Sequence, residues 1–478
     1  MKCETVNLDR CAERFGGNVI FTGTVSPATL APYINHPFTV PAGTRRVTVT
    51  LEYSKPGLCQ LYLSVFALDQ YRGSRMMPAA IGAVKLELDL SESTASLGGI
   101  AGAIPAGEWR AQLDLERTAF TVDYRLSVEL SDLEPVSPEA TNPEAVAATA
   151  TLEPAVQTAG WYRGELHSHS THSDGREDVA AVVASALHHG LNFISLTDHF
   201  TTAGWTELEQ LAPTNLCVMR GLEITGHRGH ANLHGLQSWV NPFVDQPQTW
   251  TINDAARAAH AQGALFCVNH PFALDLGWRY HEFDWGLCDL LEVYHHLEGE
   301  GNTRQLALWD ELLRAGQRIT GVAGTDSHDP FRGRHRLGQV VTVVHADALE
   351  PSAILGGLKR GAAYVSLGAE LGFTAQSGPR QAGMGETLHA DKTVQLEIEL
   401  TRLEHPARLV VLKNGWYFTH VDLPASAAQT VTLEDSEVIG GYYRLEVYAR
   451  SAQPQIGSGR EWAQTLCLSN PIYIEMIL

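Results

Sequence analysis

Histidine and carboxylate residues gather in the middle of this sequence in a pattern that favours metal chemistry. Sixteen of the 21 histidines lie between His167 and His335, in little more than a third of the chain. The first two, in the string His167-Ser168-His169, are two residues apart after a short strand-like stretch. On an extended strand such residues project to the same side, so both imidazoles can bind one metal ion. Asp174 adds a carboxylate, and such a mixed nitrogen and oxygen set suits zinc, manganese or iron.

Other residues of the same types stand where further apolar stretches end. His199 ends the stretch that begins at Asn192, Glu223 ends another, and Asp326 and His328 repeat the two-apart spacing. Each of these residues alone would be an ordinary loop residue, but their joint occurrence at successive strand ends favours a polynuclear metal site. The candidate ligands are His167, His169, Asp174, His199, Glu223, His230, His270, Asp326 and His328.

Glu223 differs from the other candidates because a carboxylate can bridge two cations, whereas an imidazole binds one. Two cations that share Glu223 would lower the pKa of a bridging water, so that hydroxide becomes the nucleophile and the metals act as Lewis acids. No nucleophilic side chain is then required, and the chain contains neither a Gly-x-Ser-x-Gly elbow nor a P-loop. We therefore predict catalytic roles for Glu223 and Asp326. A metal-bound water, Asp198 or His295 could protonate the leaving group.

Some assignments in this region stay open. His227 and His234 compete with His230 in one loop, and His172 competes with Asp174. Three further groups have expected roles at the pocket or on the surface. Arg163, Arg279 and Arg332 could bind substrate anions, His295 and His296 are expected to line the pocket, and His188, His189 and His260 are expected on helix surfaces.

The elements that must position these residues alternate between strands and helices. Strands are predicted at Phe193–Leu196, Leu265–Val268 and Ile319–Val322, and helices at Val179–His189, Ile252–Gln262 and Thr303–Ala315. This alternation from residue 161 to 366 predicts a parallel α/β architecture, most economically a barrel, with catalytic groups at the carboxyl ends of its strands.

Polar and apolar residues alternate on both sides of this α/β region. Residues 1–131 have the pattern of an antiparallel β-sandwich, and residues 367–478 that of a second small β domain with a hairpin signal at Asn414-Gly415. Residues 132–160 are rich in Pro, Ala, Glu and Thr and are predicted to be a linker.

Composition limits the classes of partner and location. The net charge of −20 disfavours nucleic acid as the main partner. Seven scattered cysteines without CxxC spacing argue against a disulfide framework and a thiolate zinc site. The chain has neither a signal peptide pattern nor an apolar run of about 18 residues, so we expect a cytoplasmic protein without membrane contact.

The ordered set of motifs resembles the polymerase-and-histidinol-phosphatase (PHP) superfamily over about residues 161–366. Its order is HxH, Ser-Asp-Gly, Thr-Asp-His, Gly-Leu-Glu, His, His-Pro and Thr-Asp-Ser-His. The N-terminal β region, Gly229-His230-Ala231-Asn232 and the ending Leu468–Tyr473 resemble the CehA/McbA family within it.

The resemblance implies a distorted seven-stranded (β/α) barrel with two to three divalent transition metals (Mn, Zn or Fe). It implies a first metal on His167, His169, Glu223 and Asp326, a second on Glu223, His230 and His270, and a third on Asp174, His199 and His328.

The expected function is a metal-dependent hydrolase acting on a small-molecule ester. A phosphate ester or diester is favoured, because most of the superfamily resembles phosphoesterases. A carboxylic or carbamic ester or amide is the alternative, because the CehA/McbA branch is named for hydrolysis of an aryl carbamate. A third possibility is a non-catalytic protein that binds carbohydrate or protein around structural metal, but closed structural zinc sites prefer cysteine-rich tetrahedra. The sequence leaves the oligomeric state open.

Overall fold

Two antiparallel sheets form the N-terminal part of the computed structural model, as the alternation predicts. Their apolar residues point inward between the sheets, as with Val47, Val49 and Leu51 on one strand and Trp109 on the facing sheet. One sheet has the order β1-β2-β9-β4-β7 and the other β3-β8-β5-β6. The strands are β1 (Glu13–Phe15), β2 (Asn18–Val25), β3 (Tyr33–Val40), β4 (Arg46–Lys55), β5 (Cys59–Ala67), β6 (Gln70–Arg75), β7 (Gly82–Ser91), β8 (Gly107–Thr118) and β9 (Val122–Ser131).

The structure describes most but not all of the chain. The described residues are 13–15, 18–29, 32–55, 59–76, 82–133, 158–244, 250–274, 276–295, 299–333, 335–450 and 464–477. Most of the expected linker and His296 lie outside these ranges.

The middle of the chain combines strands and helices. The strands are β10 (Gly160–Ser168), β11 (Phe193–Leu196), β12 (Cys217–Gly226), β13 (Gly229–His234), β14 (Leu265–Val268), β15 (Leu290–His295), β16 (Thr320–Gly324), β17 (Val341–Ala346) and β18 (Ala363–Ser366). The helices are α1 (Val179–His188), α2 (Trp205–Leu211), α3 (Ile252–His260), the short 3-10 helix η1 (Trp285–Leu287), α4 (Gly299–Arg314) and α5 (Pro351–Arg360).

The predicted elements of this region are present, with small shifts at their ends. The strands at Phe193–Leu196 and Leu265–Val268 are confirmed, and the third expected strand is β16. Helix α3 begins where its capping box requires: the Thr251 side chain accepts from the Asp254 backbone, and the Asp254 side chain accepts from the Thr251 backbone.

Strand direction departs from the predicted parallel architecture at two places, and one of them matters for the site. The pairs β10–β11, β11–β12, β14–β15 and β15–β16 are parallel, but β17 is antiparallel to both β10 and β18. Strand β13 is antiparallel to both β12 and β14. The reason is the tight turn between Gly226 and Gly229, where Gly229 has a φ of +132°. This hairpin places His230 next to the strand that carries Glu223.

The two ends of this curved sheet approach each other at the candidate metal ligands. The backbone N–H of Ser327 donates to the carbonyl of His167 (3.1 Å), and the N–H of His169 donates to the carbonyl of Ser327 (2.9 Å). Among the described residues, a parallel bridge between Ser168 and Ser327, which follows the end of β16, connects the two ends of the sheet. Strands β10 and β16 do not form a continuous ladder with each other. A regular seven-stranded (β/α) barrel is therefore not seen, although the ends of β10 and β16 meet.

The C-terminal part is again two layers of mostly antiparallel strands, with β21 paired in parallel to β28. One layer has the order β20-β19-β22-β25, and the other contains β24, β23, β26, β27 and β28. Its strands are β19 (Glu370–Ser377), β20 (Arg380–Gly383), β21 (Thr387–Ala390), β22 (Val394–Leu403), β23 (Ala407–Lys413), β24 (Trp416–Leu423), β25 (Ser426–Asp435), β26 (Gly441–Ala449), β27 (Thr465–Ser469) and β28 (Ile472–Met476).

The C-terminal part is joined to the middle by backbone and by side chains. Strand β18 pairs with β27, so one sheet continues from the middle region into the C-terminal layers. The Asn470 side chain receives the Gly321 N–H (2.7 Å) and donates to the carbonyls of Gly321 and Ala363 (2.9 Å each). The buried Arg444 guanidinium donates to both carboxylate oxygens of Asp310 on α4 (2.7 and 2.5 Å).

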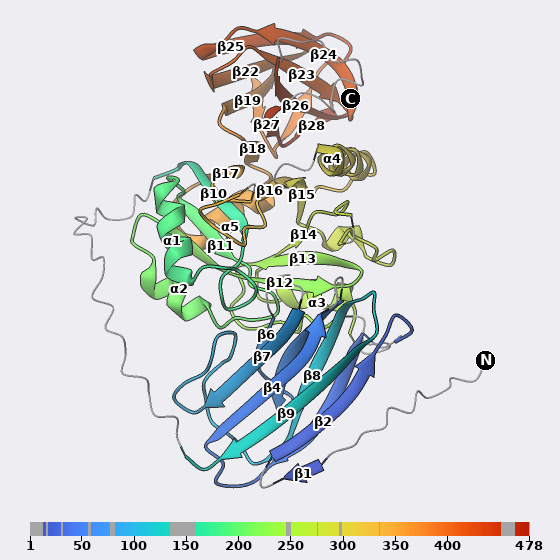
Figure 1. Ribbon diagram of the computed structural model, residues 1–478. Helices are drawn as coiled ribbons and strands as arrows, with labels where there is room; N and C mark the ends of the chain where they lie inside the picture. The colour runs from blue at the N-terminus through green and yellow to red at the C-terminus, as the bar shows by residue number, and fades with distance from the viewer. Residues whose placement is uncertain are drawn as a thin grey trace.

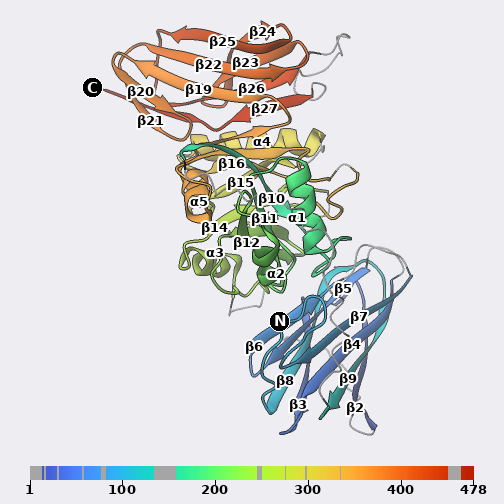
Figure 2. The ribbon, with the colours of Figure 1, turned by 90° about the vertical axis from the view of Figure 1, so that its left-hand side faces the viewer.

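The three parts are stacked in one direction, with the α/β region between the two β parts (Figures 1 and 2). The loops after β10 and β11 face the N-terminal sandwich, and β18 leads into the C-terminal strands. None of the helices in the described ranges is both long and apolar enough to cross a membrane.

Candidate metal centre

His167 and His169 stand at the carboxyl end of β10, where the strand pattern predicts that they share a face. Both side chains are completely buried, and their ring centroids are 5.2 Å apart. The structure brings two carboxylates to the same point. The Nε2 atom of His167 lies 3.3 Å from Oε2 of Glu223 and 3.4 Å from Oδ1 of Asp326, and Nε2 of His169 lies 3.4 and 3.0 Å from the same two oxygens.

These spacings fit one bound cation. Metal–ligand bonds of about 2.0–2.2 Å in a tetrahedron place neighbouring ligand atoms about 3.3–3.6 Å apart. Within the described part of the chain, Nε2 of His167 and Oε2 of Glu223 are buried and form no hydrogen bond of good geometry. Buried polar atoms are normally satisfied, so a cation between them would explain the arrangement.

Glu223 faces a different set of groups with each carboxylate oxygen. Oε2 faces His167, His169 and also Nδ1 of His199 (3.0 Å). Oε1 lies 3.1 Å from Nδ1 of His230 and 3.8 Å from Nε2 of His270. The side chain of Asn269 also donates to Oε1 (2.9 Å). Glu223, His230 and His270 offer ligand atoms within 4.8 Å of one another, so they form a second group that could hold a metal.

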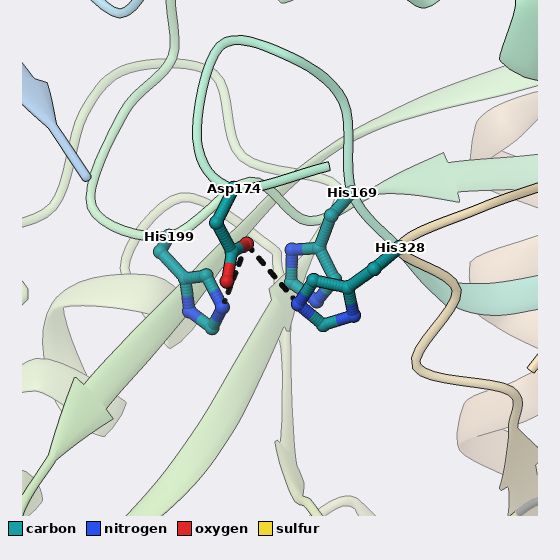
Figure 3. A group of neighbouring side chains, drawn as sticks. All are labelled: His169, Asp174, His199 and His328. Carbon is teal, nitrogen blue, oxygen red and sulfur yellow. Dashed lines mark ion pairs between the residues drawn. The ribbon is translucent and has the colours of Figure 1, made fainter. Parts of the chain in front are cut away.

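A third group lies around Asp174 (Figure 3). Oδ1 of Asp174 is 3.1 Å from Nε2 of His328 and 3.5 Å from Nε2 of His199, and His169 completes the set. Burial lowers the pKa of His328, but the charges of Asp174 and Asp326 outweigh burial and raise it to about 10. Burial lowers the pKa of His199 to about 4. All nine predicted ligands therefore fall into three adjoining groups.

Backbone strain is concentrated at this centre. His270 and Asp326 have φ values of +26° and +50°, and Phe200, directly after His199, has +63°. Such conformations cost about 1–3 kcal/mol each for residues with a side chain and persist where the surroundings fix them.

Two buried carboxylates, neither of which the sequence pattern predicts to have a role, support the candidate ligands. Oε1 of Glu292 lies 2.7 Å from Nδ1 of His167, and Oε2 accepts the backbone N–H of His270 (2.8 Å). Burial would raise the pKa of Glu292, but the charge of His167 and hydrogen bonds from His167 and His295 hold it well below its usual value. Glu292 also lies within one group with His167 and His270 that could hold a metal. Its sequence signal is a carboxylate inside the apolar strand β15.

Glu165 ties the first strand to the last ligand loop. Its Oε1 accepts backbone N–H groups of His167 (3.0 Å) and Thr325 (3.0 Å), and its Oε2 accepts the Thr325 hydroxyl (2.7 Å). Burial raises the pKa of Glu165 to about 7. Thr325 directly precedes Asp326, so Glu165 fixes the loop that carries this candidate ligand.

The two candidates for protonating the leaving group have different surroundings. Both oxygens of Asp198 are engaged by Ser170 and Ser173: Oδ1 accepts the Ser170 N–H and the Ser173 hydroxyl, and Oδ2 accepts the Ser170 hydroxyl. Asp198 thus holds the loop that leads to Asp174. His295 lies with Nε2 3.9 Å from Oδ2 of Asp326 and with Nδ1 3.4 Å from Oε2 of Glu292.

The three arginines predicted to bind substrate lie outside the ligand groups, each at a different position. Arg163 is on β10 four residues before His167, or about 13 Å along the strand, and lines a cavity of about 720 Å³ together with Glu370 and Arg402 of the C-terminal part. Arg279 is exposed and donates to the carbonyl of His227 in the β12–β13 turn (2.9 Å). Arg332 is exposed four residues after His328.

The histidines that the sequence left as alternatives to His230 and Asp174 have other contacts. Nδ1 of His172 accepts from Gly98 of the N-terminal sandwich, and His234 lies 2.9 Å from the Ser195 hydroxyl at the other end of β13. His227 is exposed in the turn, and neither His172, His227 nor His234 belongs to a potential metal group within the described ranges. His260 pairs with Asp289 (2.7 Å), and His188 is exposed.

Comparison with known proteins gives similarity at low levels. No protein-family model matches the chain, and no curated protein matches its sequence. Among solved structures, it is similar to a two-domain protein from Bacteroides vulgatus that contains a predicted PHP-like metal-dependent phosphoesterase. That match has 19% identity and a TM-score of 0.38 and covers 66% of this chain and 97% of that one.

An amidohydrolase from Chromobacterium violaceum, with bound sulfate and no metal, is also similar, at 16% identity and a TM-score of 0.29 over 36% of this chain and 90% of that chain.

Proposed function

We propose that this chain is a metal-dependent hydrolase of the PHP type that uses an activated water as its nucleophile. The observation that carries the proposal is the position of Glu223, whose two carboxylate oxygens face two separate ligand groups. A bridging carboxylate of this kind is the usual way in which hydrolases hold two cations close together. The finer assignment to the CehA/McbA family is part of the proposal.

The chain's own residues would divide the work as follows. His167, His169, Glu223 and Asp326 would hold one cation, Glu223, His230 and His270 a second, and Asp174, His199 and His328 a third. When bound, divalent manganese, zinc or iron would supply Lewis acidity and a water activated at neutral pH. Glu292 would fix the ring of His167 and keep Nε2 directed into the site.

Protonation of the leaving group is assigned to Nε2 of His295. This atom lies beside Oδ2 of Asp326 at the edge of the ligand cluster, while Nδ1 faces Glu292. Asp198 is assigned to positioning, because its oxygens already accept three hydrogen bonds from the neighbouring loop. Arg279 and Arg332 are exposed near the ligand loops and would meet an anionic part of a substrate, whereas Arg163 is too far along β10 to do so.

A phosphate ester or diester of a small molecule is the proposed substrate. Three divalent cations carry six positive charges, and the carboxylates of the ligand groups, Asp174, Glu223, Glu292 and Asp326, offset four. The loaded centre would therefore favour an anionic group over a neutral one. A carboxylic or carbamic ester or amide hydrolase is the alternative, since the same activated water could attack a carbonyl.

An activity screen tests the proposal. Protein loaded with manganese, zinc or iron is assayed on p-nitrophenyl phosphate, bis(p-nitrophenyl) phosphate, p-nitrophenyl acetate and a 1-naphthyl carbamate, with Glu223→Gln as the inactive control. Hydrolysis of the phosphate compounds that is lost in the control supports the proposal. Hydrolysis of only the acetate or carbamate supports the alternative, and glycan binding without any hydrolysis would favour a binding protein.

A further inference from the structure

The N-terminal sandwich contacts the loops that carry the third ligand group. Arg75, at the end of β6, directs its guanidinium into the loop between His169 and Asp174. Its Nη1 donates to the backbone carbonyls of Thr171 (2.8 Å) and Ser173 (3.0 Å). Ser173 directly precedes Asp174, so the sandwich fixes the backbone on one side of this ligand.

A second loop of the sandwich reaches the same place. The N–H of Gly98 donates to Nδ1 of His172 (3.2 Å), and the carbonyl of Gly98 accepts the hydroxyl of Thr201 (2.9 Å). Gly98 has a φ of +79°, and a Cβ atom there would lie 2.1 Å from the carbonyl oxygen of Ser74 and 2.8 Å from that of His172. Only glycine fits this close approach, which joins the loop of Asp174 to the loop of His199.

Apolar packing holds the His199 loop from the same side. Phe200 is buried, and its ring centroid lies 5.7 Å from that of Tyr62 in the sandwich and 5.2 Å from that of Phe243. These residues form one small apolar cluster with Phe66 and Met76 of the sandwich. The strained φ of Phe200 is therefore maintained in part by contacts from the sandwich.

Among the described contacts, no residue of the first two ligand groups bonds directly to the sandwich, although the backbone of Glu223 bonds to Asp198 and Phe200 of the His199 loop. Their residues stand on or directly after β10, β12, β13, β14 and β16, and their supporting groups Glu165, Glu292 and Asn269 belong to the same α/β region. Loosening the Arg75 contacts, which reach only the loop before Asp174, would therefore affect the third group most directly.

We propose that the N-terminal sandwich completes the third cation site, with Arg75 as the positioning residue that holds the loop of Asp174. This inference rests on the proposed function, because it requires that the third group binds a cation. Loss of the Arg75 hydrogen bonds frees the backbone carbonyls of Thr171 and Ser173 and lets Asp174 move away from His199 and His328. Removal of a group that orients a metal ligand typically costs about 10- to 100-fold in metal affinity.

The test is titration of the metal-free full-length protein with Mn²⁺ alone, with bound metal measured by elemental analysis. The wild type should bind three equivalents, and His328→Ala marks which equivalent belongs to the third site. Arg75→Ala should weaken that same equivalent by about 10- to 100-fold and leave the other two unchanged. Combining Arg75→Ala with His328→Ala should cause no further loss, because both changes act on one site, and Arg75→Lys should recover part of the affinity.

The matched control is Arg46→Ala, which removes an arginine that pairs with Asp89 (2.6 Å) within the same sandwich. It should bind three equivalents like the wild type. If Arg75→Ala does not fold, Thr201→Val tests the same coupling from the His199 loop and should also weaken only the third equivalent. Three equivalents with wild-type affinity in either folded variant overturn the inference and leave the proposed function intact. A wild type that binds two equivalents or fewer removes the third site itself, and this outcome is visible without any variant.

Discussion

The Nδ1 atom of His167 and the Oε1 atom of Glu292 lie 2.7 Å apart in a fully buried contact. The contact leaves Nε2 of His167 facing Glu223 and Asp326. A carboxylate on the far nitrogen of a metal-binding histidine fixes the ring and makes it a stronger ligand. The two residues are 125 positions apart in the chain, so the contact depends on the pairing of the whole curved sheet.

Replacing this carboxylate should weaken metal binding without unfolding the protein. Glu292→Gln keeps the size of the side chain but removes the charge next to His167. We expect affinity for the first cation to fall by about 10- to 100-fold, with a near-native circular dichroism spectrum. Glu209→Gln, which changes an exposed partner of Arg220, is the control and should bind metal normally. Unchanged metal affinity in Glu292→Gln would show that Glu292 does not support the ligand.

Glu223→Gln tests the bridging carboxylate. Its amide keeps the shape of the side chain but cannot offset the repulsion between two cations. We expect turnover to fall by about 100-fold or more and metal content to fall with it, while circular dichroism stays near native. His188→Ala on the exposed end of α1 should behave like the wild type. If Glu223→Gln keeps its metal and most of its turnover, the site must instead be centred on Asp326.

Metal content should be two to three equivalents in the purified or reconstituted protein, because nine ligands exceed the needs of one ion. Bound metal should also raise Tm, since free metal at about 100 times Kd adds about 2.7 kcal/mol per site. Elemental analysis and thermal unfolding with and without EDTA measure both effects. At most one equivalent after reconstitution, with no change in Tm, would argue against a polynuclear centre.

Affinity at the third site should depend on pH through His328. Its pKa is raised from 6.5 to about 10, because the charges of Asp174 and Asp326 outweigh burial. A raised pKa in the folded state means that the ion pair stabilises the metal-free fold fully below pH 6.5 and that this contribution is lost as the pH rises through about 10.

A cation at this site must displace the His328 proton, so affinity for Mn²⁺ should increase with pH by up to about tenfold per unit below the pKa. Titrations at three pH values between about 6.5 and 8.5, in wild type and His328→Ala, measure this slope. Equal affinities at all three would contradict a proton-linked ligand.

Most of the candidate ligands could be placed together from the sequence, because they follow apolar stretches and strand ends share one rim. Glu223 inside β12, His230 at the start of β13 and Asp174 in the loop after β10 do not follow this rule. The same reasoning could not identify Glu292. It is a single carboxylate within an apolar strand, and only the folded structure shows that it lies beside His167. The reasoning also could not identify Arg75, which belongs to a separate sandwich and acts on backbone carbonyls that have no sequence signature. Strand alternation predicted the parallel pairs but missed the β12–β13 hairpin, because its Gly-His-Arg-Gly turn lies inside what looks like a loop between a strand and a helix.

Asn470 bonds to the backbone of β16 and β18, and β27 covers the edge of β18. These contacts can form only late in synthesis of the chain. A chain still on the ribosome can pair β16 with β15, but the bonds from Asn470 to Gly321 and Ala363 form only after residue 470 has emerged. Until β27 follows, the edge of β18 that it covers stays open to pairing with other nascent chains.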